Sequence, residues 1–144
     1  MPRGYKFLRD DWRSGQGDEP PWREGEERHV DGPVVLCEHG YHWSESWLDA
    51  LRYAPGSVAA RVEVSEPGAG YGDKYVSARC RLLVAREVKQ QLRVFTYDIA
   101  ERALLQERER GREPDKRSWQ AIEVTRRYLA GQATLDELVS ARAA

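Results

Sequence analysis

The sequence has little of what several protein classes require. No apolar run in its 144 residues approaches the roughly 20 that a membrane-spanning helix needs, so a spanning segment is excluded. The first residues, MPRGYKFLRDDW, lack the apolar core of a secretion signal. Two cysteines are too few for a disulfide framework, which favours a reduced, cytoplasmic setting. The 23 basic side chains nearly match the 24 acidic ones, and this balance disfavours nucleic acid as a partner.

Alternating apolar residues indicate strands in the first part of the chain. Residues 58–64 and 76–84 place apolar and polar side chains on opposite faces with a period of two. A short aromatic and aliphatic run at residues 4–8 suits a strand, and residues 33–37, led by a proline, predict a buried one. The two alternating segments are expected to turn one face to the core, made of Val58, Ala60, Val62, Val64, Val76, Ala78, Cys80, Leu82 and Val84.

A short helix is predicted at residues 44–54. Its N-terminal cap is Ser44 or Ser46, because a serine hydroxyl accepts a hydrogen bond from a free backbone N–H of the first turn. The apolar face at helical spacing consists of Trp47, Leu48 and Leu51.

A long loop covers residues 10–28 and contains Trp12 and Trp22. Long loops in compact domains are more often functional or mobile than idle. The two tryptophans either pin the loop onto the core or form an exposed binding edge. We favour pinning, since most large aromatic side chains are at least partly buried.

The hydrophobic period changes to about 3.6 from residue 95 onward, which predicts helices. Thr96, Asp115 and Thr134 are the expected caps, and Gly131 is an expected helix stop. Strands that precede helices favour an α+β fold: a small, mostly antiparallel sheet with one short helix, followed by two or three C-terminal helices. The predicted division is a sheet-rich domain at residues 1–94 and a helical extension at residues 95–144, packed on the domain or forming a small subdomain.

The densest group of reactive side chains is Cys37-Glu38-His39-Gly40-Tyr41-His42. One interpretation is a zinc site, with Cys80 as a fourth ligand beside Cys37, His39 and His42. Zinc is not favoured, because the spacing lacks two well-formed ligand pairs. A cysteine nucleophile is a second interpretation. The structural interpretation is preferred: Cys37 is a small buried strand residue and Gly40 supplies a turn with positive φ.

Charges alternate in sign from Glu107 to Glu113, as expected of a solvated helix end with weak ion pairs. The alternative is a docking surface for a charged partner. The arginines assigned to that surface are Arg108, Arg110, Arg112, Arg126 and Arg127. No complete set of catalytic residues is recognisable, and the sequence leans away from an enzyme.

Short motifs in the first part resemble a family of small uncharacterised domains of bacteria and their phages. They are Tyr5-Lys6-Phe7-Leu8, Cys37-x-x-Gly40-x-His42, Asp49-Ala50-Leu51-x-Tyr53, Val62-Glu63-Val64 and Asp73-Lys74-x-Val76. The resemblance covers residues 4–88. It implies a bacterial or phage context, and so the cytoplasm of a bacterial host cell.

The second part resembles the opening segment of proteins described as bacterial immunity proteins. The matching residues are Asp98-x-Ala100-Glu101-Arg102-Ala103-Leu104, Ala121-Ile122-Glu123 and Tyr128-x-x-Gly131. The resemblance implies an inhibitor-like or immunity-like protein whose partner is a host or phage protein, with no membrane involved. This is the leading functional prediction for the chain.

At the level of fold, the order of motifs is also similar to ADP-ribosyltransferases. A strand with a basic residue, a strand that follows a turn, and a helix ending in an aromatic residue match Lys6, His42 and Tyr53. Asp73-Lys74 occupies the position of that family's catalytic glutamate. The resemblance implies an alternative function, binding of NAD or another nucleotide by Lys6, His42, Tyr53 and Lys74 without catalysis; otherwise no cofactor is favoured. The position of Cys37 relative to His42 and Lys74 discriminates between a site and a structural turn.

Overall fold

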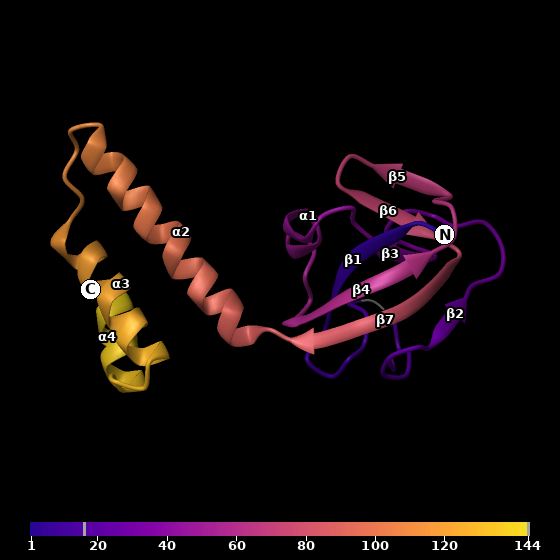
Figure 1. Ribbon diagram of the computed structural model, residues 1–144, viewed down its shortest axis with the longest axis horizontal. Coiled ribbons are helices and arrows are strands. Elements are labelled where there is room, and N and C mark those ends of the chain that lie inside the picture. The colour runs from indigo at the N-terminus through magenta and orange to yellow at the C-terminus, as the bar shows by residue number, and fades with distance from the viewer. Residues whose placement is uncertain (16, 144) are drawn as a thin grey trace. The chain divides into compact units, whose positions relative to one another are not determined.

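The computed structural model describes residues 1–15 and 17–143 of the chain. It divides into two compact units, Met1–Val88 and Lys89–Ala144 (Figure 1). The division falls earlier than residue 94, because helix α2 (Lys89–Glu109) already begins at Lys89. Residues 89–93 are lysine, glutamine, leucine and arginine, whose straight side chains favour a helix. The α+β class is confirmed.

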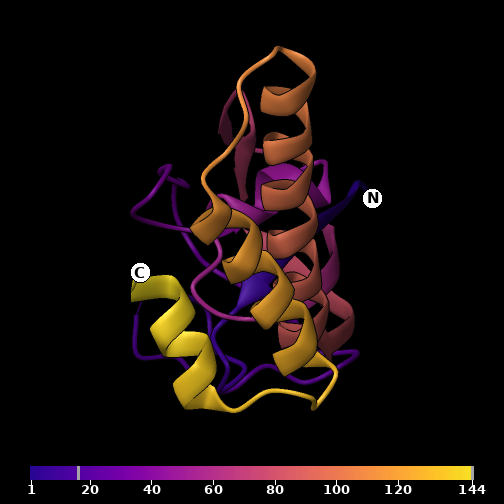
Figure 2. The same ribbon diagram turned by 90° about the vertical axis from the view of Figure 1, so that its left-hand side faces the viewer.

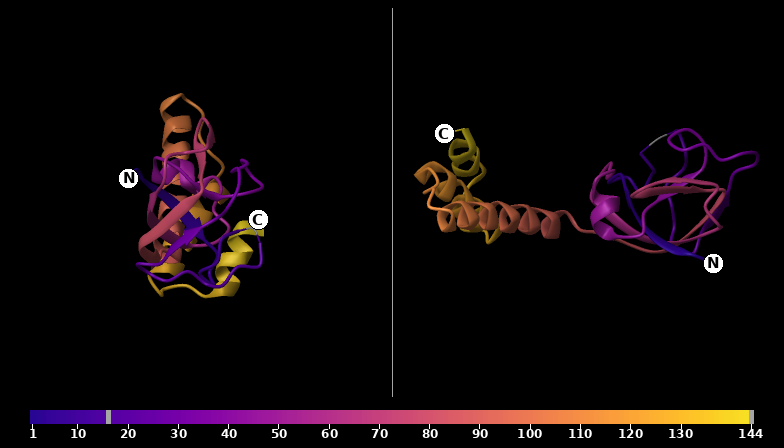
Figure 3. Two further views of the ribbon diagram at one scale, coloured as in Figure 1. Left: turned by 90° about the vertical axis from the view of Figure 1, so that its right-hand side faces the viewer. Right: turned by 90° about the horizontal axis from the view of Figure 1, so that it is seen from above.

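The first unit contains a four-stranded antiparallel sheet with the strand order β1-β4-β7-β2, whose strands are labelled in Figure 1; Figure 3 gives two further views of the ribbon. Its strands are β1 (Arg3–Leu8), β4 (Val58–Val64), β7 (Arg79–Glu87) and β2 (Glu27–His29). The central strand β4 turns its valines to the core, as its alternation predicted, and all of them are completely buried. Burial of this apolar face is the main stabilising contribution to the sheet.

A second, three-stranded antiparallel sheet has the order β3-β6-β5, with β3 (Tyr41–Trp43), β6 (Lys74–Ser77) and β5 (Ala69–Tyr71). The two sheets meet at a backbone bridge between Tyr5 of β1 and Ser44 next to β3. Each residue donates its N–H to the carbonyl of the other, at 2.8 Å in both directions. This bridge fixes the junction at which the candidate site lies.

Two details of the predicted strands are wrong. The segment at 76–84 is divided between β6 and β7, and a register irregularity in the pairing of β4 with β7 changes which residues face inward. Leu82 and Ala85 are buried, whereas Val84 is only half-buried. A bulge inserts one residue into a ladder and so reverses the alternation beyond it, which no single-strand pattern reveals.

The buried strand predicted at residues 33–37 is also absent. Val35 forms an isolated bridge with His39, and the chain turns between them. Cys37 lies in this turn with a φ of 68°, and it is exposed where burial was expected. No strand pairs with residues 33–37 along their length. The segment instead forms a turn that is closed by backbone hydrogen bonds between Val35 and His39.

Helix α1 (Trp47–Leu51) is capped by Ser46, one of the two expected caps. Its Oγ accepts the N–H of Asp49 at 3.1 Å. The predicted apolar face is wrong in part: Ala50 is the buried residue, and Leu48 is 60% exposed. Trp47 of the predicted face does meet the sheet, because its ring centroid lies 4.4 Å from that of Tyr5 and 5.9 Å from that of Phe7 in β1.

The loop at 10–28 is pinned by its tryptophans, as predicted. Trp22 is buried in the core cluster and Trp12 packs against that cluster. The backbone N–H of Trp22 donates to the carbonyl of Trp12 at 2.7 Å, and the guanidinium of Arg28 lies 4.0 Å from the Trp22 ring centroid. These contacts hold the described part of the loop over the mouth of the candidate site.

The second unit contains α2, α3 (Lys116–Leu129) and α4 (Leu135–Ala143) (Figure 2). Asp115 caps α3 and Thr134 accepts the N–H of Glu137 at 3.1 Å, as expected of both. Thr96 is not a cap, because it lies inside α2 and donates its hydroxyl to the carbonyl of Leu92. No helix among the described residues is long and apolar enough to cross a membrane.

Candidate functional site

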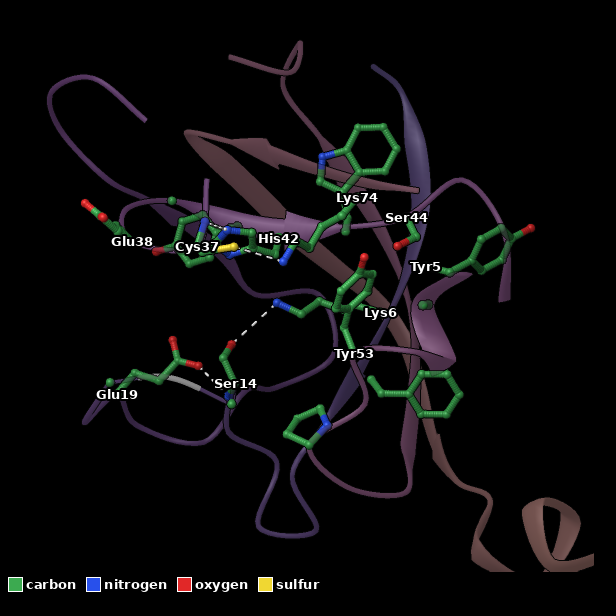
Figure 4. Close-up of a pocket in the computed structure, with 18 residues that line it drawn as sticks. Tyr5, Lys6, Ser14, Glu19, Cys37, Glu38, His42, Ser44, Tyr53 and Lys74 are labelled. Atoms are coloured by element: carbon green, nitrogen blue, oxygen red, sulfur yellow. Dashed lines mark hydrogen bonds between the residues drawn. The ribbon is translucent and has the colours of Figure 1, made fainter. Parts of the chain in front are cut away.

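A cavity of about 360 Å³ opens where the two sheets of the first unit meet (Figure 4). Its walls come from β1, β3, β6, the end of α1, the loop at 10–28 and the turn before β3. The four residues of the nucleotide-binding prediction, Lys6, His42, Tyr53 and Lys74, all line it, and so does Cys37. The fold therefore brings together side chains that are far apart in sequence.

Lys6 lies in the middle of β1 with its side chain in the cavity (Figure 4). It is only 9% exposed, although it carries a charge. Its Nζ donates a long hydrogen bond of 3.4 Å to Ser14 Oγ and lies 5.7 Å from the Trp22 ring centroid. Among the described residues, no carboxylate lies within 4.0 Å of this ammonium group. Burial of a charge without a paired counter-charge is costly, so an anion in the cavity would offset that cost.

The nearest acidic group of this wall, Glu19, is engaged by other donors. It accepts the backbone N–H of Ser14 at 2.6 Å and Trp22 Nε1 at 3.1 Å, and it pairs with Arg28 at 3.1 Å. Burial alone would raise the pKa of Glu19, but the hydrogen bonds from Ser14 and the charge of Lys6 bring it below its usual value. Glu19 is thus an anion that orders the loop.

His42 is a neutral group between the two lysines. Burial lowers its pKa to about 4, and the positive charges of Lys6 and Lys74 act in the same direction. Its Nε2 accepts the backbone N–H of Cys37 at 2.7 Å, so the ring proton is carried by Nδ1. His42 therefore holds the turn at Cys37 while adding no charge to the cavity.

Lys74 connects the turn with the rim of the cavity. Its Nζ donates to Cys37 Sγ at 3.0 Å and lies 4.3 Å from the ring centroid of Tyr53 (Figure 4). Lys74 is therefore the second cation of the cavity, and it is held by a thiol and a ring in place of a carboxylate.

Asp73, at the position matched to a catalytic glutamate, does not point a free carboxylate into the cavity. Tyr53 donates its hydroxyl to Asp73 Oδ1 at 2.7 Å, and Arg52 pairs with Asp73 at 3.1 Å. The hydrogen bond from Tyr53 lowers the pKa of Asp73, and the same bond raises the pKa of Tyr53. Asp73 thus fixes Tyr53, which forms part of the cavity wall.

The side chains considered as zinc ligands are not brought together. Cys80 is 1% exposed in the core, and burial raises the pKa of its thiol to about 11. His39 lies apart from the cavity lining, with Nε2 2.9 Å from the carbonyl of Asp31. In the described part of the chain, no group of three or more ligand-type side chains is placed to hold a metal ion.

Each arginine predicted to bind a partner lies within ion-pair distance of a carboxylate in its own helical unit. The pairs are Arg108 with Glu113, Arg110 with Glu107, Arg112 with Glu107, Arg126 with Glu101, and Arg127 with Glu137. Exposed ion pairs are individually weak, so a charged partner could displace them. The assignment of these arginines to a partner stays a prediction.

Sequence reasoning missed several residues of the site, including Tyr5, Ser14 and Glu19, whereas the positive φ predicted for Gly40 is confirmed. Gly40 has a φ of 121°, and a Cβ there would lie 2.5 Å from Val76, so only glycine permits the close approach of the turn to β6. The length of the loop at 10–28 indicated a functional segment. No local signal identified Ser14 or Glu19 within it, since their positions depend on the burial of Trp22.

The chain belongs to a family described as a domain of unknown function, DUF7666, whose family model matches residues 3–94. No curated protein and no solved structure matches the chain. The matched residues include every segment that lines the cavity, whereas α3 and α4 lie outside the match. The cavity therefore lies entirely within the segment that the family model matches.

Proposed function

We propose that the first unit binds a small anionic ligand of the nucleotide class, such as NAD or ADP-ribose, in this cavity. The observation that carries the proposal is Lys6, a buried ammonium group in a cavity wall with no carboxylate at ion-pair distance among the described residues. A phosphate group beside Lys6 would form the charge-assisted hydrogen bonds that Ser14 supplies only weakly.

Besides Lys6, a second cation and a neutral donor support an anion at the same place. The two carboxylates of the lining are Glu19, which is paired with Arg28, and Glu38, which is exposed. Lys74 is a second cation of the lining, and its observed partners, the Cys37 thiol and the Tyr53 ring, carry no formal charge in the neutral state. His42 stays uncharged at neutral pH, and its Nδ1–H is a further donor. Two cations and one neutral donor suit a phosphate or diphosphate group.

The size and the aromatic lining favour a nucleotide over a simple inorganic anion. A cavity of about 360 Å³ lies in the range of roughly 300–1,000 Å³ that is typical of small-molecule sites. The ring of Tyr53 lies beside Lys74 in the lining, and aromatic rings stack readily on bases. Binding is proposed in preference to catalysis, because the Glu19 and Asp73 carboxylates are occupied by hydrogen-bond donors within the protein.

Isothermal calorimetry of the full chain with NAD, ADP-ribose and inorganic pyrophosphate tests the proposal. We expect saturable binding, weakened about tenfold or more by Lys6→Met, since a charge-assisted hydrogen bond contributes roughly 1.5–3 kcal/mol. His42→Ala should weaken it as well. Lys116→Met, which removes an exposed lysine of α3, is the matched control and should leave affinity unchanged. Absence of binding heat with all three ligands would refute the proposal.

A second proposal concerns the helical unit, which is predicted to bind a host or phage protein. The observation in its favour is an exposed apolar pair one turn apart on α2: Phe95 is 41% exposed and Ile99 is 51% exposed. Charged residues at these positions would prevent an apolar contact. We expect a purified partner to lose binding to the Ile99→Glu chain and to retain binding to the Lys116→Met chain. Equal binding to both would exclude this surface.

A further inference from the structure

We propose that Cys37 is a site of oxidation by peroxide and that its oxidation closes the cavity to anionic ligands. The inference rests on the proposed function, since it concerns the affinity of that same cavity. Two features outside Cys37 itself point to it. One is the cavity that the cysteine lines, and the other is Lys6, which is nine-tenths buried and directed into that cavity.

Cys37 meets both conditions that make a cysteine susceptible to oxidation, exposure and a cationic neighbour. It is exposed on its turn, and Lys74 Nζ lies 3.0 Å from its sulfur. The turn fixes the backbone of Cys37, because the residue has a positive φ and its N–H is held by His42. The sulfur attached to this backbone lies next to Lys74.

The chain offers no second thiol near Cys37. Its only other cysteine, Cys80, is enclosed in the core of the sheet. An intramolecular disulfide is therefore excluded in the folded chain, and oxidation must add oxygen to the sulfur. The first step is R–SH + H₂O₂ → R–SOH + H₂O, in which an S–O bond forms, the peroxide O–O bond breaks, sulfur is oxidised and peroxide is reduced to water. A second peroxide converts R–SOH to R–SO₂H and water by the same oxygen transfer.

The products differ from the thiol in the group they present to Lys74. A sulfenic acid adds an oxygen acceptor, and a sulfinate adds a negative charge within reach of the ammonium group. A carboxylate or other oxyanion that is hydrogen-bonded to a lysine occupies one of its three donors and neutralises its charge. The oxidised side chain thus takes the place of the ligand's own anionic group at Lys74.

The closing experiment compares ADP-ribose binding by the reduced full chain and by the same chain after hydrogen peroxide treatment. Mass spectrometry of peptides identifies the oxidised residue. We expect oxidation at Cys37 and not at Cys80, with affinity reduced about tenfold or more. For Cys37→Ser, the affinity for ADP-ribose should be the same before and after peroxide treatment, whereas Cys80→Ser should still lose affinity on treatment.

Cys37→Asp provides an independent test, because it places a permanent carboxylate beside Lys74. Aspartate tolerates positive φ better than most residues, so this variant should fold. Its reduced chain should show the same loss of affinity as the oxidised natural chain. Unchanged affinity with Cys37 fully oxidised, or oxidation confined to Cys80, would overturn this inference alone. Failure of the reduced chain to bind any of NAD, ADP-ribose and pyrophosphate would instead overturn both this inference and the proposed function.

Discussion

Trp43 donates its indole N–H to the hydroxyl of Ser77 across the buried contact between β3 and β6, at 3.0 Å. The hydroxyl of Ser77 in turn donates to the carbonyl of Ser65 at 2.8 Å. These two hydrogen bonds connect β3 and β6 of the smaller sheet to Ser65, the residue that follows β4. They satisfy polar groups where Ser77 is completely buried.

Replacement of Ser77 by alanine should therefore destabilise the first unit by about 1–3 kcal/mol, because it leaves a buried indole N–H and a carbonyl without partners. Denaturant unfolding followed by tryptophan fluorescence measures this loss. Ser140→Ala, at an exposed position of α4, is the control and should change little. A Ser77→Ala chain as stable as the natural one would show that the hydrogen bonds contribute nothing net.

The Lys6→Met chain should be at least as stable as the natural protein while it loses ligand affinity. Methionine fills similar space without a buried charge, and buried charges are often neutral or unfavourable for folding. Denaturant unfolding without ligand gives the stability, and calorimetry gives the affinity. A clear loss of stability in the Lys6→Met chain would show that the Lys6 side chain stabilises the fold. That result would count against a ligand as the reason for the burial of Lys6.

Acid should destabilise the first unit through His42. Its pKa is about 4 in the folded chain and 6.5 ordinarily, so the unfolded chain binds the proton first as pH falls. The stability that His42 contributes is complete above a pH of about 6.5 and decreases as the pH falls toward 4. The loss should be smaller than the roughly 3 kcal/mol that the full pKa difference would give, since solvent screens this half-buried ring. Unfolding measured across this window should show the slope.

The control for this pH dependence is His42→Asn, which removes the titrating group. Its unfolding free energy should be flatter between these two pH values than that of the natural chain. A proton NMR titration measures the pKa of the His42 imidazole in the folded chain directly. An apparent pKa near 6.5 in the folded protein would contradict the buried, neutral histidine described above.

Ser46→Ala should weaken α1 and cost about 1 kcal/mol of unfolding free energy, because the N–H of Asp49 loses its acceptor. Ser46→Asn retains a capping oxygen and should behave nearly like the natural chain. The measurement is again denaturant unfolding. Since Tyr53 follows α1 and lines the cavity, the alanine variant should also bind ADP-ribose less tightly if the proposed function holds.

The fold could be predicted to a large extent wherever a local pattern was sufficient. The buried valines of β4, the caps at Asp115 and Thr134, and the pinning of Trp22 followed from alternation, side-chain chemistry and size. Prediction failed where the outcome depended on a second segment. The inward face of β7 depends on its register with β4, and α2 begins before the residue at which its periodicity becomes recognisable.

The candidate site shows the same division. The predicted set of Lys6, His42, Tyr53 and Lys74 came from a resemblance, and the four residues do line one cavity. Cys37 was expected in the core and is instead exposed beside Lys74. A turn closed by backbone bonds and by His42 places it there, and hydropathy carries no information about such bonds.

By itself, the sequence determined the near balance of charge, the order of strands before helices and the residue types available for a site. Tertiary structure alone decided that Lys6 is buried and that Lys74 approaches a thiol. It also decided that the only two cysteines have opposite environments. The physical reason is that patterning along one segment sets which face is apolar, whereas the partner of a charge depends on contacts between segments far apart in the chain.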